Sequence, residues 1–465
     1  MLPKVASLLF AAAIMTAASH VDAAPVTIPA PSARPQDIAP GSDTFLRALA
    51  DRTAAPLFSA RVTAAADSLP VLGERLADVA AARAQRDQAR SRLFPGIGLD
   101  LVASRTIARD LQLPTTQVEN LSPLRRNDAI GSVEQLITDF GASSARIRAG
   151  NAATDAARAD LDATRNTALL QLVGSWYDVL AAQTAMALAQ SHVERMQVLA
   201  DGAALRFATG VDSGGDVARA RSYLAAAQGQ KIGFDRRLRS AEARYLELFG
   251  TLPGAVARPD IGAGPSAGEG AVRPELVAAR FDERAAAAAL DAARADRLPR
   301  LDARISSAGY DVLRGTAPAY DVRAQLTLRQ RFSTGGAEAA RVAELAARRR
   351  SAAFAVDRIA AATDRELGVA AADVDGLADS VPPLERAYLD SRRARDLYAE
   401  QFRVSRGTLF DVLRAERDLL EAALVLARAN YELDVARFTL LARQGGLIER
   451  FGMVPAVIAD KSEAH

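Results

Sequence analysis

The sequence predicts a mainly α-helical protein in which one unit occurs twice and each copy adds two strands to a membrane β-barrel. Three observations support this fold class: long helical stretches, short segments in which apolar and polar residues alternate, and motifs that recur at one constant spacing. The 465 residues are 49% hydrophobic and 25% charged, a composition that excludes a disordered or collagen-like chain.

The chain begins with the features of a secretory signal. Lys4 precedes an Ala/Leu/Val-rich run over Val5–Ala18, and Val21-Asp22-Ala23 ahead of Ala24 places small residues at the cleavage positions. The apolar run is shorter than the roughly 20 residues that a membrane-spanning helix needs. We therefore expect residues 1–23 to be a signal peptide, with the exact cleavage position open, and residues 24–70 to be an N-terminal extension of an exported chain.

The composition excludes several classes of function. The chain has no cysteine and three histidines, so thiolate nucleophiles, disulfides, Cys/His zinc sites and lipid attachment through an N-terminal cysteine are not available. A net charge of +2, with basic residues spread along the chain, is not the pattern of a nucleic-acid-binding protein. No phosphate-binding loop or hydrolase motif occurs. We expect no catalytic, cofactor or metal site, and hence no enzyme.

The first long helix is expected over Ala142–Thr209. This stretch has no proline, alanine and straight-chain residues dominate it, and apolar residues recur at spacings of three, four and seven. About 68 residues at 1.5 Å each give a rod on the order of 100 Å, a length that favours a coiled-coil assembly. Trp176 and Tyr177 are expected to pack in the wall of that assembly, and His192 to be exposed.

The second long helix is expected over Ala337–Val404. Pro382 and Pro383 interrupt it, and because proline removes a backbone donor and clashes with the preceding turn, they must kink or break the helix. The constant spacing of the two copies favours a kink or a restart in line over a hairpin, and the sequence leaves kink and break open.

Shorter helices flank each long helix. One precedes it and ends at a proline, and another follows it after a short turn. The expected shorter helices are Val71–Leu93, Asp216–Phe249, Pro274–Leu298 and Leu409–Arg443. The expected domains are a first repeat at 71–250, a Gly-rich linker at 251–272, a second repeat at 273–450 and a tail at 451–465.

One constant spacing relates the two copies. Arg146 matches Arg341 within similar motifs, and Asp216 matches Asp411, each 195 residues further along the chain. Because the spacing is unchanged over about 70 residues, neither copy contains a net insertion relative to the other. A long rigid element in each copy would impose such a constraint.

The pattern changes from helical to alternating after the prolines at 95 and 299. Apolar residues alternate with polar or charged residues in four segments of about ten residues, which is typical of transmembrane strands around an aqueous lumen. The apolar faces are formed by Ile97, Leu99, Leu101 and Ala103; by Ala129, Val133 and Ile137; by Leu301, Ala303 and Ile305; and by Val322, Ala324, Leu326 and Leu328. Since about eight strands are the minimum for a barrel, several chains would have to share one. A soluble hairpin beneath the helices is the alternative.

Five short motifs occur in a fixed order along this arrangement. They are Arg-Leu-Phe-Pro at 92–95, Thr-Asp-Phe-Gly at 138–141, Arg-Phe-Ala-Thr-Gly at 206–210, Arg-Pro-Glu-Leu at 273–276 and Gln-Phe-Arg-Val-Ser-Arg-Gly-Thr-Leu-Phe-Asp-Val-Leu at 401–413. Together with the doubled order of helix, strand, strand, long helix, turn and helix, they resemble the TolC family of outer-membrane efflux and secretion channels over roughly residues 71–450.

The resemblance implies a homotrimer whose chains each contribute four strands to a 12-stranded barrel in the outer-membrane lipid of a Gram-negative bacterium. It also implies that the barrel continues into an α-helical coiled-coil tube across the periplasm. The partners that it implies are a periplasmic adaptor, or membrane-fusion protein, and an inner-membrane ABC or other export pump.

The resemblance also assigns candidate residues to a gate at the periplasmic tip. Asp411 matches a ring of aspartates at the narrowest point, and Arg414 lies one helical turn on, where the family is often acidic. Phe402 matches an aromatic residue of the closing network. The family's arginine before a Thr-Leu pair is replaced by Gly407, with Arg406 one place earlier, so this chain departs from the family pattern here.

Asp216 is the matching acid of the first repeat. A plainer interpretation of Asp216 and Asp411 is that they occupy first helical turns, where capping and the helix dipole favour an acid. The positions expected to dock the adaptor are Gly210, Ser213, Gly407 and Thr408.

The expected function is a passive outer-membrane exit channel that an inner-membrane partner energises. The tip sequence Thr408–Leu413 is more similar to type I protein-secretion members than to multidrug efflux members, which remain the alternative. A soluble periplasmic coiled-coil scaffold is the alternative from another class, although a scaffold would not need alternating strands. The cargo and the identity of the pump cannot be deduced from the sequence.

Overall fold

The computed structural model describes most of the chain. The described residues are 26–32, 34–52, 55–108, 110, 125–260, 273–313, 319–330, 332 and 335–457. The expected signal peptide and most of the expected linker lie outside these residues.

The chain divides into two compact units. The unit that we call the sheet unit comprises Ala66–Leu170, Gly264–Ala371 and Thr439–His465, and the unit that we call the turn unit comprises Met1–Ala65, Gln171–Ala263 and Ala372–Phe438. The long helices contribute a part to each unit.

The two expected repeats of helices are present. The helices are α1 (Thr44–Ala50), α2 (Ala55–Ser68), α3 (Pro70–Ser91), α5 (Ala142–Ala208), α6 (Gly214–Phe249), α7 (Pro274–Ala295), α8 (Ala337–Arg403), α9 (Leu409–Arg443) and α10 (Leu447–Arg450), with 3-10 turns at Pro35–Asp37 and Pro40–Ser42. The long helices α5 and α8 both contain 67 residues, and α3 and α7 both contain 22. Within the described ranges, no helix combines the length and the apolar character needed to cross a membrane.

The two prolines do not break α8, which is one continuous helix through Pro382 and Pro383. The break is therefore excluded. Proline in a helix interior leaves carbonyl groups of the preceding turn without their usual N–H partners. The prolines thereby remove the usual donors of the Ala378 and Asp379 carbonyls, while the Ser380 hydroxyl in the same turn donates to the Leu377 carbonyl at 2.8 Å.

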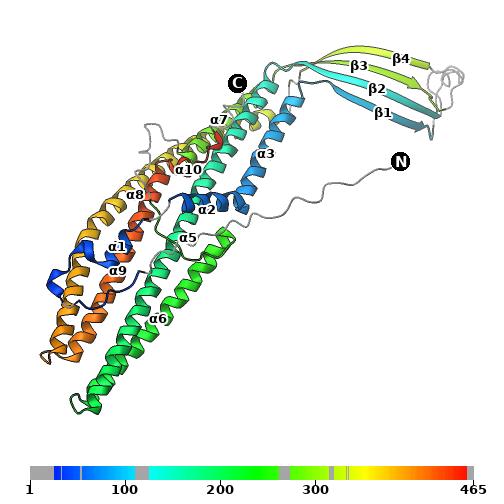
Figure 1. Ribbon diagram of the computed structural model, residues 1–465. Coiled ribbons are helices and arrows are strands. Elements are labelled where there is room, and N and C mark those ends of the chain that lie inside the picture. Colours follow the sequence, from blue (N-terminus) through cyan, green and yellow to red (C-terminus); the bar gives the residue numbers. More distant parts are fainter. Residues whose placement is uncertain are drawn as a thin grey trace. The chain divides into compact units, whose positions relative to one another are not determined.

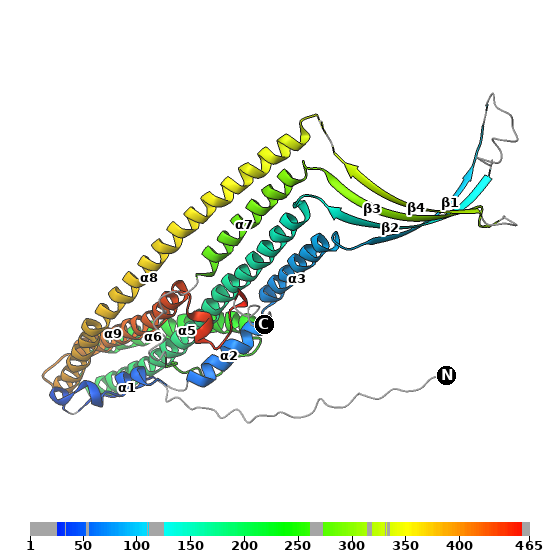
Figure 2. The ribbon, with the colours of Figure 1, turned by 90° about the horizontal axis from the view of Figure 1, so that it is seen from above.

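The sheet unit contains a four-stranded antiparallel sheet. Its strands are β1 (Gly96–Arg105), β2 (Arg125–Thr138), β3 (Arg300–Tyr310) and β4 (Ala319–Arg329), in the order β1-β2-β3-β4. Figure 2 shows α3, α7 and the sheet-proximal parts of α5 and α8 side by side, each running into one strand. The predicted elements thus fold into one sheet that combines both repeats.

The register places the predicted apolar residues on one face. Ile97 pairs with Val133, Val133 with Ile305, and Ile305 with Ala324, so one apolar row crosses all four strands. Because side chains alternate between faces, residues two positions away along each strand share this face. Several of its large side chains are highly exposed in the single chain, including Ile97 at 84% and Leu326 at 72%.

The opposite face of the sheet is more polar, and some of its acids are paired. Asp302 is 5% exposed and accepts a hydrogen bond from Arg300 at 2.8 Å. Asp128 is also buried and accepts from Arg126 at 2.6 Å. Asp302 thus lies on the face that was predicted to be polar, and it is paired there with Arg300.

Equivalent turns connect the sheet to the long helices in both repeats. Phe140 and Gly141 have φ values of +52° and +103°, and Gly335 and Gly336 have +62° and +87°. Each pair precedes its helix by the same number of residues, so the doubled motif corresponds to a doubled left-handed turn. Glycine adopts this region without strain, whereas Phe140 does so at a cost.

An aromatic cluster forms the core of the turn unit beside α2. Trp176 is 3% exposed and packs against Phe58 at 5.1 Å between ring centroids, while Tyr245 stacks on Phe249 at 4.0 Å. Trp176 and Tyr177 are thus buried, as expected. Figure 1 shows α1 and α2 lying beside the long helices of this unit.

His192 is buried and not exposed, which corrects the expectation for it. Its exposed fraction is 4%, and its Nδ1 has no hydrogen-bond partner among the described residues. Burial lowers the pKa of His192 below its ordinary value, and the nearby Glu416 charge partly opposes that shift. An alanine-rich helix has weak contrast between its faces, so the periodicity did not identify this buried position.

Candidate functional site

The turn between α5 and α6 is closed by local hydrogen bonds. Gly210 has a φ of +75°, and the Val211 amide donates to the Arg206 carbonyl at 2.8 Å, which ends α5. Arg206 also donates from Nε to both oxygens of Asp212 at 3.1 and 3.0 Å. All of these bonds to the turn therefore come from residues of the first repeat.

Ser213 and Asp216 form a capping box at the start of α6. The Ser213 hydroxyl accepts from the Asp216 amide at 3.2 Å, and Asp216 accepts from the Ser213 amide at 3.2 Å and hydroxyl at 2.7 Å. These bonds lower the pKa of Asp216 and stabilise its charged form. Within a single chain, the contacts of Asp216 are therefore those of an acid that caps the first turn of its helix.

The turn between α8 and α9 has similar chemistry. Ser405 has a φ of +60°, and the Arg406 amide donates to the Gln401 carbonyl at 2.8 Å. The Thr408 hydroxyl accepts from the Asp411 amide at 3.2 Å and donates to the Asp411 carboxylate at 2.6 Å. Both candidate gate acids thus bond to a hydroxyl of their own turn.

Gly407 allows the second turn to lie close to the end of α8. A Cβ at this position would lie 3.2 Å from the Gln401 Cβ and 3.3 Å from the Phe402 nitrogen, which is tighter than ordinary contact. The departure from the family's arginine therefore has a local steric reason. Arg406 next to it is exposed and forms no salt bridge with a described residue.

Contacts between cations and aromatic rings join the two helical hairpins near the turns. The Arg206 guanidinium lies 4.8 Å from the centroid of the Phe402 ring, and Arg219 lies 5.0 Å from the Phe410 ring. Beneath them, buried Leu409 and Leu413 of α9 pack with apolar residues of α5 and α6. The structure thus brings Phe402 into a contact between the two repeats.

Sequence reasoning missed three members of this arrangement, namely Arg206, Arg219 and Phe410. Their partners lie in the other repeat, about 195 residues away, and no local pattern marks such a pair. The 195-residue spacing of the two repeats places Arg206 opposite Gln401, and this difference between the copies was the available signal. Arg414 lies 3.8 Å from Asp418 on its own helix, and this exposed pair reduces its influence on Asp411.

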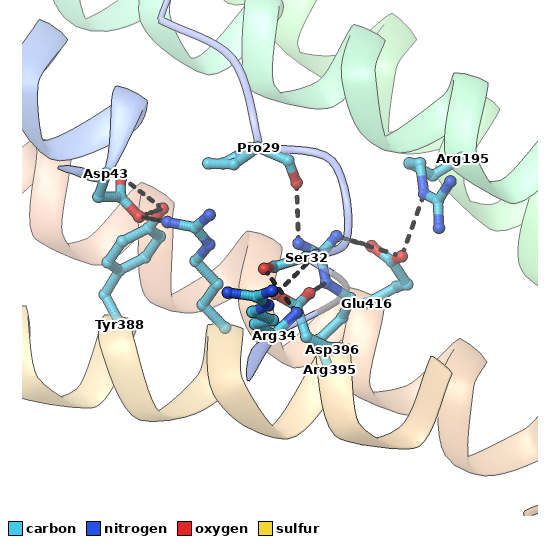
Figure 3. Close-up of polar contacts among 10 residues, drawn as sticks. Pro29, Ser32, Arg34, Asp43, Arg195, Tyr388, Arg395, Asp396 and Glu416 are labelled. Atoms are coloured by element: carbon cyan, nitrogen blue, oxygen red, sulfur yellow. Dashed lines mark hydrogen bonds and ion pairs between the residues drawn. The ribbon is translucent and has the colours of Figure 1, made fainter. Parts of the chain in front are cut away.

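A buried ionic network lies further along the same unit (Figure 3). Arg395 is fully buried and donates to Asp396 at 2.5 Å, to Glu416 at 3.4 Å and to the Pro29 carbonyl at 2.8 Å. Arg195 of α5 reaches the same Glu416 at 3.2 Å. Since α5, α8, α9 and the N-terminal segment all contribute, the network fixes four chain segments together.

A second ionic cluster secures α1 to α8. Asp43 caps α1 by accepting from the Leu46 amide at 2.9 Å, and it also accepts bonds from Tyr388 and Arg392. Burial and the Asp43 charge raise the pKa of the Tyr388 phenol, which stays protonated and donates. Figure 3 shows Asp43 and Tyr388 pointing toward each other.

A third buried acid, Asp434 of α9, binds the segment that precedes α2 and the segment that follows α6. It accepts from Arg258 at 2.6 Å and from Arg52 at 3.3 Å, and the Tyr177 hydroxyl lies at 3.3 Å. Buried charges are tolerated where every member is paired, as here. In the described part of the chain, no group of histidine or acidic residues is arranged to hold a metal ion. These buried charges attach segments of the chain to one another.

Comparisons with known proteins agree with this geometry. Residues 63–251 match the family model described as outer membrane efflux protein. The chain is 23% identical over 322 residues to the outer membrane efflux protein BepC of Brucella suis, covering 67% of this chain and 71% of BepC. It is 26% identical over 400 residues to the protein CyaE of Bordetella pertussis, covering 81% of each.

A solved structure extends the likeness over both repeats. The outer membrane protein VceC of Vibrio cholerae superposes with a TM-score of 0.74 at 17% identity, covering 84% of this chain and 96% of VceC. The expected fold, with long paired helices in two repeats and a four-stranded antiparallel sheet, is confirmed.

Proposed function

Because this chain belongs to the outer membrane efflux protein family, we propose that three copies of it form the exit channel of a tripartite export machine. The family consists of outer-membrane channels with a periplasmic helical tube and not of enzymes. The chain is accordingly an efflux channel of the Gram-negative outer membrane.

The observation that supports shared assembly most strongly is the sheet. β1 and β4 are its edge strands, and each leaves a row of backbone groups without a partner in the described chain. Such edges are normally paired or covered, and in lipid they must be paired. Four strands cannot close on themselves, so neighbouring copies would pair β1 with β4 and build the proposed 12-stranded barrel.

The exposed apolar face supports lipid as its surroundings. Leu99, Leu101 and Leu328 are 71%, 74% and 66% exposed on one face, where water would penalise them. A soluble scaffold would gain nothing from this face. Lipid contact removes the penalty and matches the outward side of a membrane strand.

The proposed partners would dock where the two turns lie. Both turns expose polar side chains, among them Ser213, Arg406 and Thr408, and an apolar cluster beneath keeps the hairpins together. A periplasmic adaptor would engage these positions together with Gly210 and Gly407. An inner-membrane ABC or other pump would supply the energy.

The proposed cargo is a protein exported by a type I route, and this part rests on the tip sequence Thr408–Leu413 alone. The test is a deletion of this chain in its host, followed by analysis of proteins in the medium and of susceptibility to a panel of drugs. Loss of one exported protein with unchanged susceptibility supports the proposal. Hypersensitivity with an unchanged set of exported proteins would show a multidrug channel instead.

A further inference from the structure

A groove of about 790 Å³ in the turn unit belongs neither to the tip nor to the ionic network. It is lined by α5, α6 and α9, which run side by side in Figure 1. On α6 the lining residues recur every three or four positions, so they form one face of that helix. These residues are Gln230, Phe234, Arg237, Ala241 and Arg244, with Ser240 at the margin.

The floor of the groove is apolar and made of small side chains on α5. Ala181, Ala182 and Ala185 line it, and Leu420 and Leu424 of α9 form the adjoining wall. Alanine at these positions leaves open volume between the helices. Asp178 and Thr184 are the polar residues that α5 adds to this lining, which is mostly apolar, as is usual for sites that hold an organic tail.

The groove is on the side of α5 away from the aromatic core. Ala185 follows Trp176 by nine residues, about two and a half helical turns, so the two side chains point in opposite directions. Trp176 packs against Phe58 of α2. The N-terminal helix α2 therefore covers one side of α5, and the groove lies on the other.

Four arginines and two acids, Asp178 and Glu421, are the charged residues that line the groove, so its net charge is positive. Arg417 pairs with Asp418 at 3.2 Å and Arg428 with Glu432 at 2.7 Å, so these two cations are already partnered. Arg237 and Arg244 on α6 form no salt bridge with a described residue.

Arg237 and Arg244 have different neighbours. Arg237 lies 5.5 Å from the centroid of the Phe234 ring, which leaves its guanidinium edge able to donate. Arg244 interacts electrostatically with Asp178, another lining residue, and this attraction partly opposes the rise in the pKa of Asp178 that burial causes.

We propose that this groove binds an amphiphilic anion, with its carboxylate or sulfonate head held by Arg237 and Arg244 and its alkyl or aryl tail on the alanine floor. Guanidinium groups match planar anionic heads with paired donors. The volume of the groove is within the range of sites that enclose small organic ligands. A cationic amphiphile would place its head among the arginines and be repelled.

The consequence for transport rests on the proposed channel. If α2 lies outside the wall of such a tube, the groove on the opposite side of α5 opens toward the lumen, where an amphiphilic anion in transit could bind. Binding itself does not require this placement. Trimer formation on gels, recorded for every variant below, separates a failure of assembly from a failure of binding.

The absence of cysteine from the chain allows a direct test. Ser240→Cys places one thiol at the groove, and Ser222→Cys places one on exposed α6 outside it. Trimers in phosphatidylcholine nanodiscs are labelled with a maleimide in the presence of decanoate or of decyltrimethylammonium. We expect saturating decanoate to slow labelling at position 240 by about tenfold and to leave position 222 unchanged.

Arginine variants on the Ser240→Cys background show which arginines bind the anionic head group. Arg237→Ala and Arg244→Ala should each reduce the protection by decanoate, whereas Arg239→Ala should not, because Arg239 is exposed outside the groove and pairs with Asp235. Equal protection by the cationic amphiphile would overturn the proposal. A second result would also overturn the proposal. If the thiol at position 240 stays unlabelled in the ligand-free trimer but reacts after denaturation, a neighbouring copy covers the groove.

Discussion

Glu416 is the residue on which the buried ionic network converges. Its side chain is fully buried, and two arginines from two other helices, Arg395 and Arg195, donate to it. Removing one partner from a buried pair leaves an uncompensated charge, which costs more than the pair itself contributes. The network therefore fixes the arrangement of α5, α8 and α9 more than it adds net stability.

Replacing Glu416 by Gln should strongly destabilise the turn unit, by about 3–5 kcal/mol, because Arg395 would lose its carboxylate while remaining buried. The chain has a single tryptophan, Trp176, in the core of the same unit, so its fluorescence reports unfolding directly. The matched control is Glu432→Gln, which breaks an exposed pair with Arg428 and should change stability by less than about 1 kcal/mol. Similar unfolding temperatures for the two variants would contradict the role of Glu416.

His192 should make the folded chain less stable in mild acid. Its pKa is lowered in the folded state, so the unfolded chain binds a proton more readily as the pH falls through the ordinary value of 6.5. Its contribution therefore favours folding above that pH and is lost below it. His192→Gln should reduce the difference in unfolding temperature between pH 7.5 and pH 5. An unchanged difference would show that other groups produce the acid sensitivity.

At the scale of elements, the strands were predicted closely because alternation is a local property. The register then adds what no single strand shows, a continuous apolar row from Ile97 through Val133 and Ile305 to Ala324. Long-range partners could not be predicted in this way. Arg395 meets the Pro29 carbonyl 366 residues away, and His192 is buried near Glu416 of the other repeat.

The N-terminal helices show a second limit of sequence reasoning. Residues 24–70 have an ordinary composition without a repeat to compare, so α1 and α2 were not expected. What places them is a set of ion pairs and aromatic contacts with α5, α8 and α9, such as Arg52 with Asp434 and Phe58 with Trp176. The candidate tip shows the same limit, since Arg206 and Phe402 meet only in three dimensions.

Leu326→Arg should destabilise the proposed barrel by about 2–4 kcal/mol if the residue lies near the middle of the bilayer. The neighbouring position on the other face supplies the control, because Gln325→Arg introduces the same side chain toward the proposed lumen. Asp302 is unsuitable as a control because it is paired with Arg300. The measurement is the yield of heat-modifiable trimer on gels. Equal yields for both variants would argue against lipid contact of this face.

Insertion of a bulky tag at Ser213 should abolish export while trimers still form, because the proposed adaptor engages that turn. The capping box with Asp216 would be lost, but this cap lies at one helix end and the apolar cluster beneath is untouched. Ser213→Ala is the matched variant that removes the cap without adding bulk, and it should leave export near the wild-type level. Export at full rate with the tag in place would exclude this turn as a docking site.

At the scale of the whole assembly, threefold repetition turns weak local charges into a ring. Asp411 is partly exposed and bonds only to its own turn in the single chain, through Thr408. Three copies around a proposed constriction would bring three such carboxylates together, raise the local field and favour cations. The same repetition would let exposed pairs, each worth about 0–1 kcal/mol, act together on a gate.

Asp411→Asn should therefore lower the cation preference of the channel, measured as a shift of the reversal potential in a salt gradient across a planar bilayer. The shift should be larger at 0.01 M than at 1 M salt, because the screening length falls from about 30 Å to about 3 Å. Arg414 points its charge toward Asp418 and offsets the ring only weakly. Asp235→Asn, which removes an exposed acid paired with Arg239 on α6, is the control and should leave the potential unchanged. If Asp411→Asn also leaves it unchanged at low salt, Asp411 acts only as a helix-start residue and the narrowest point lies at another level of the tube.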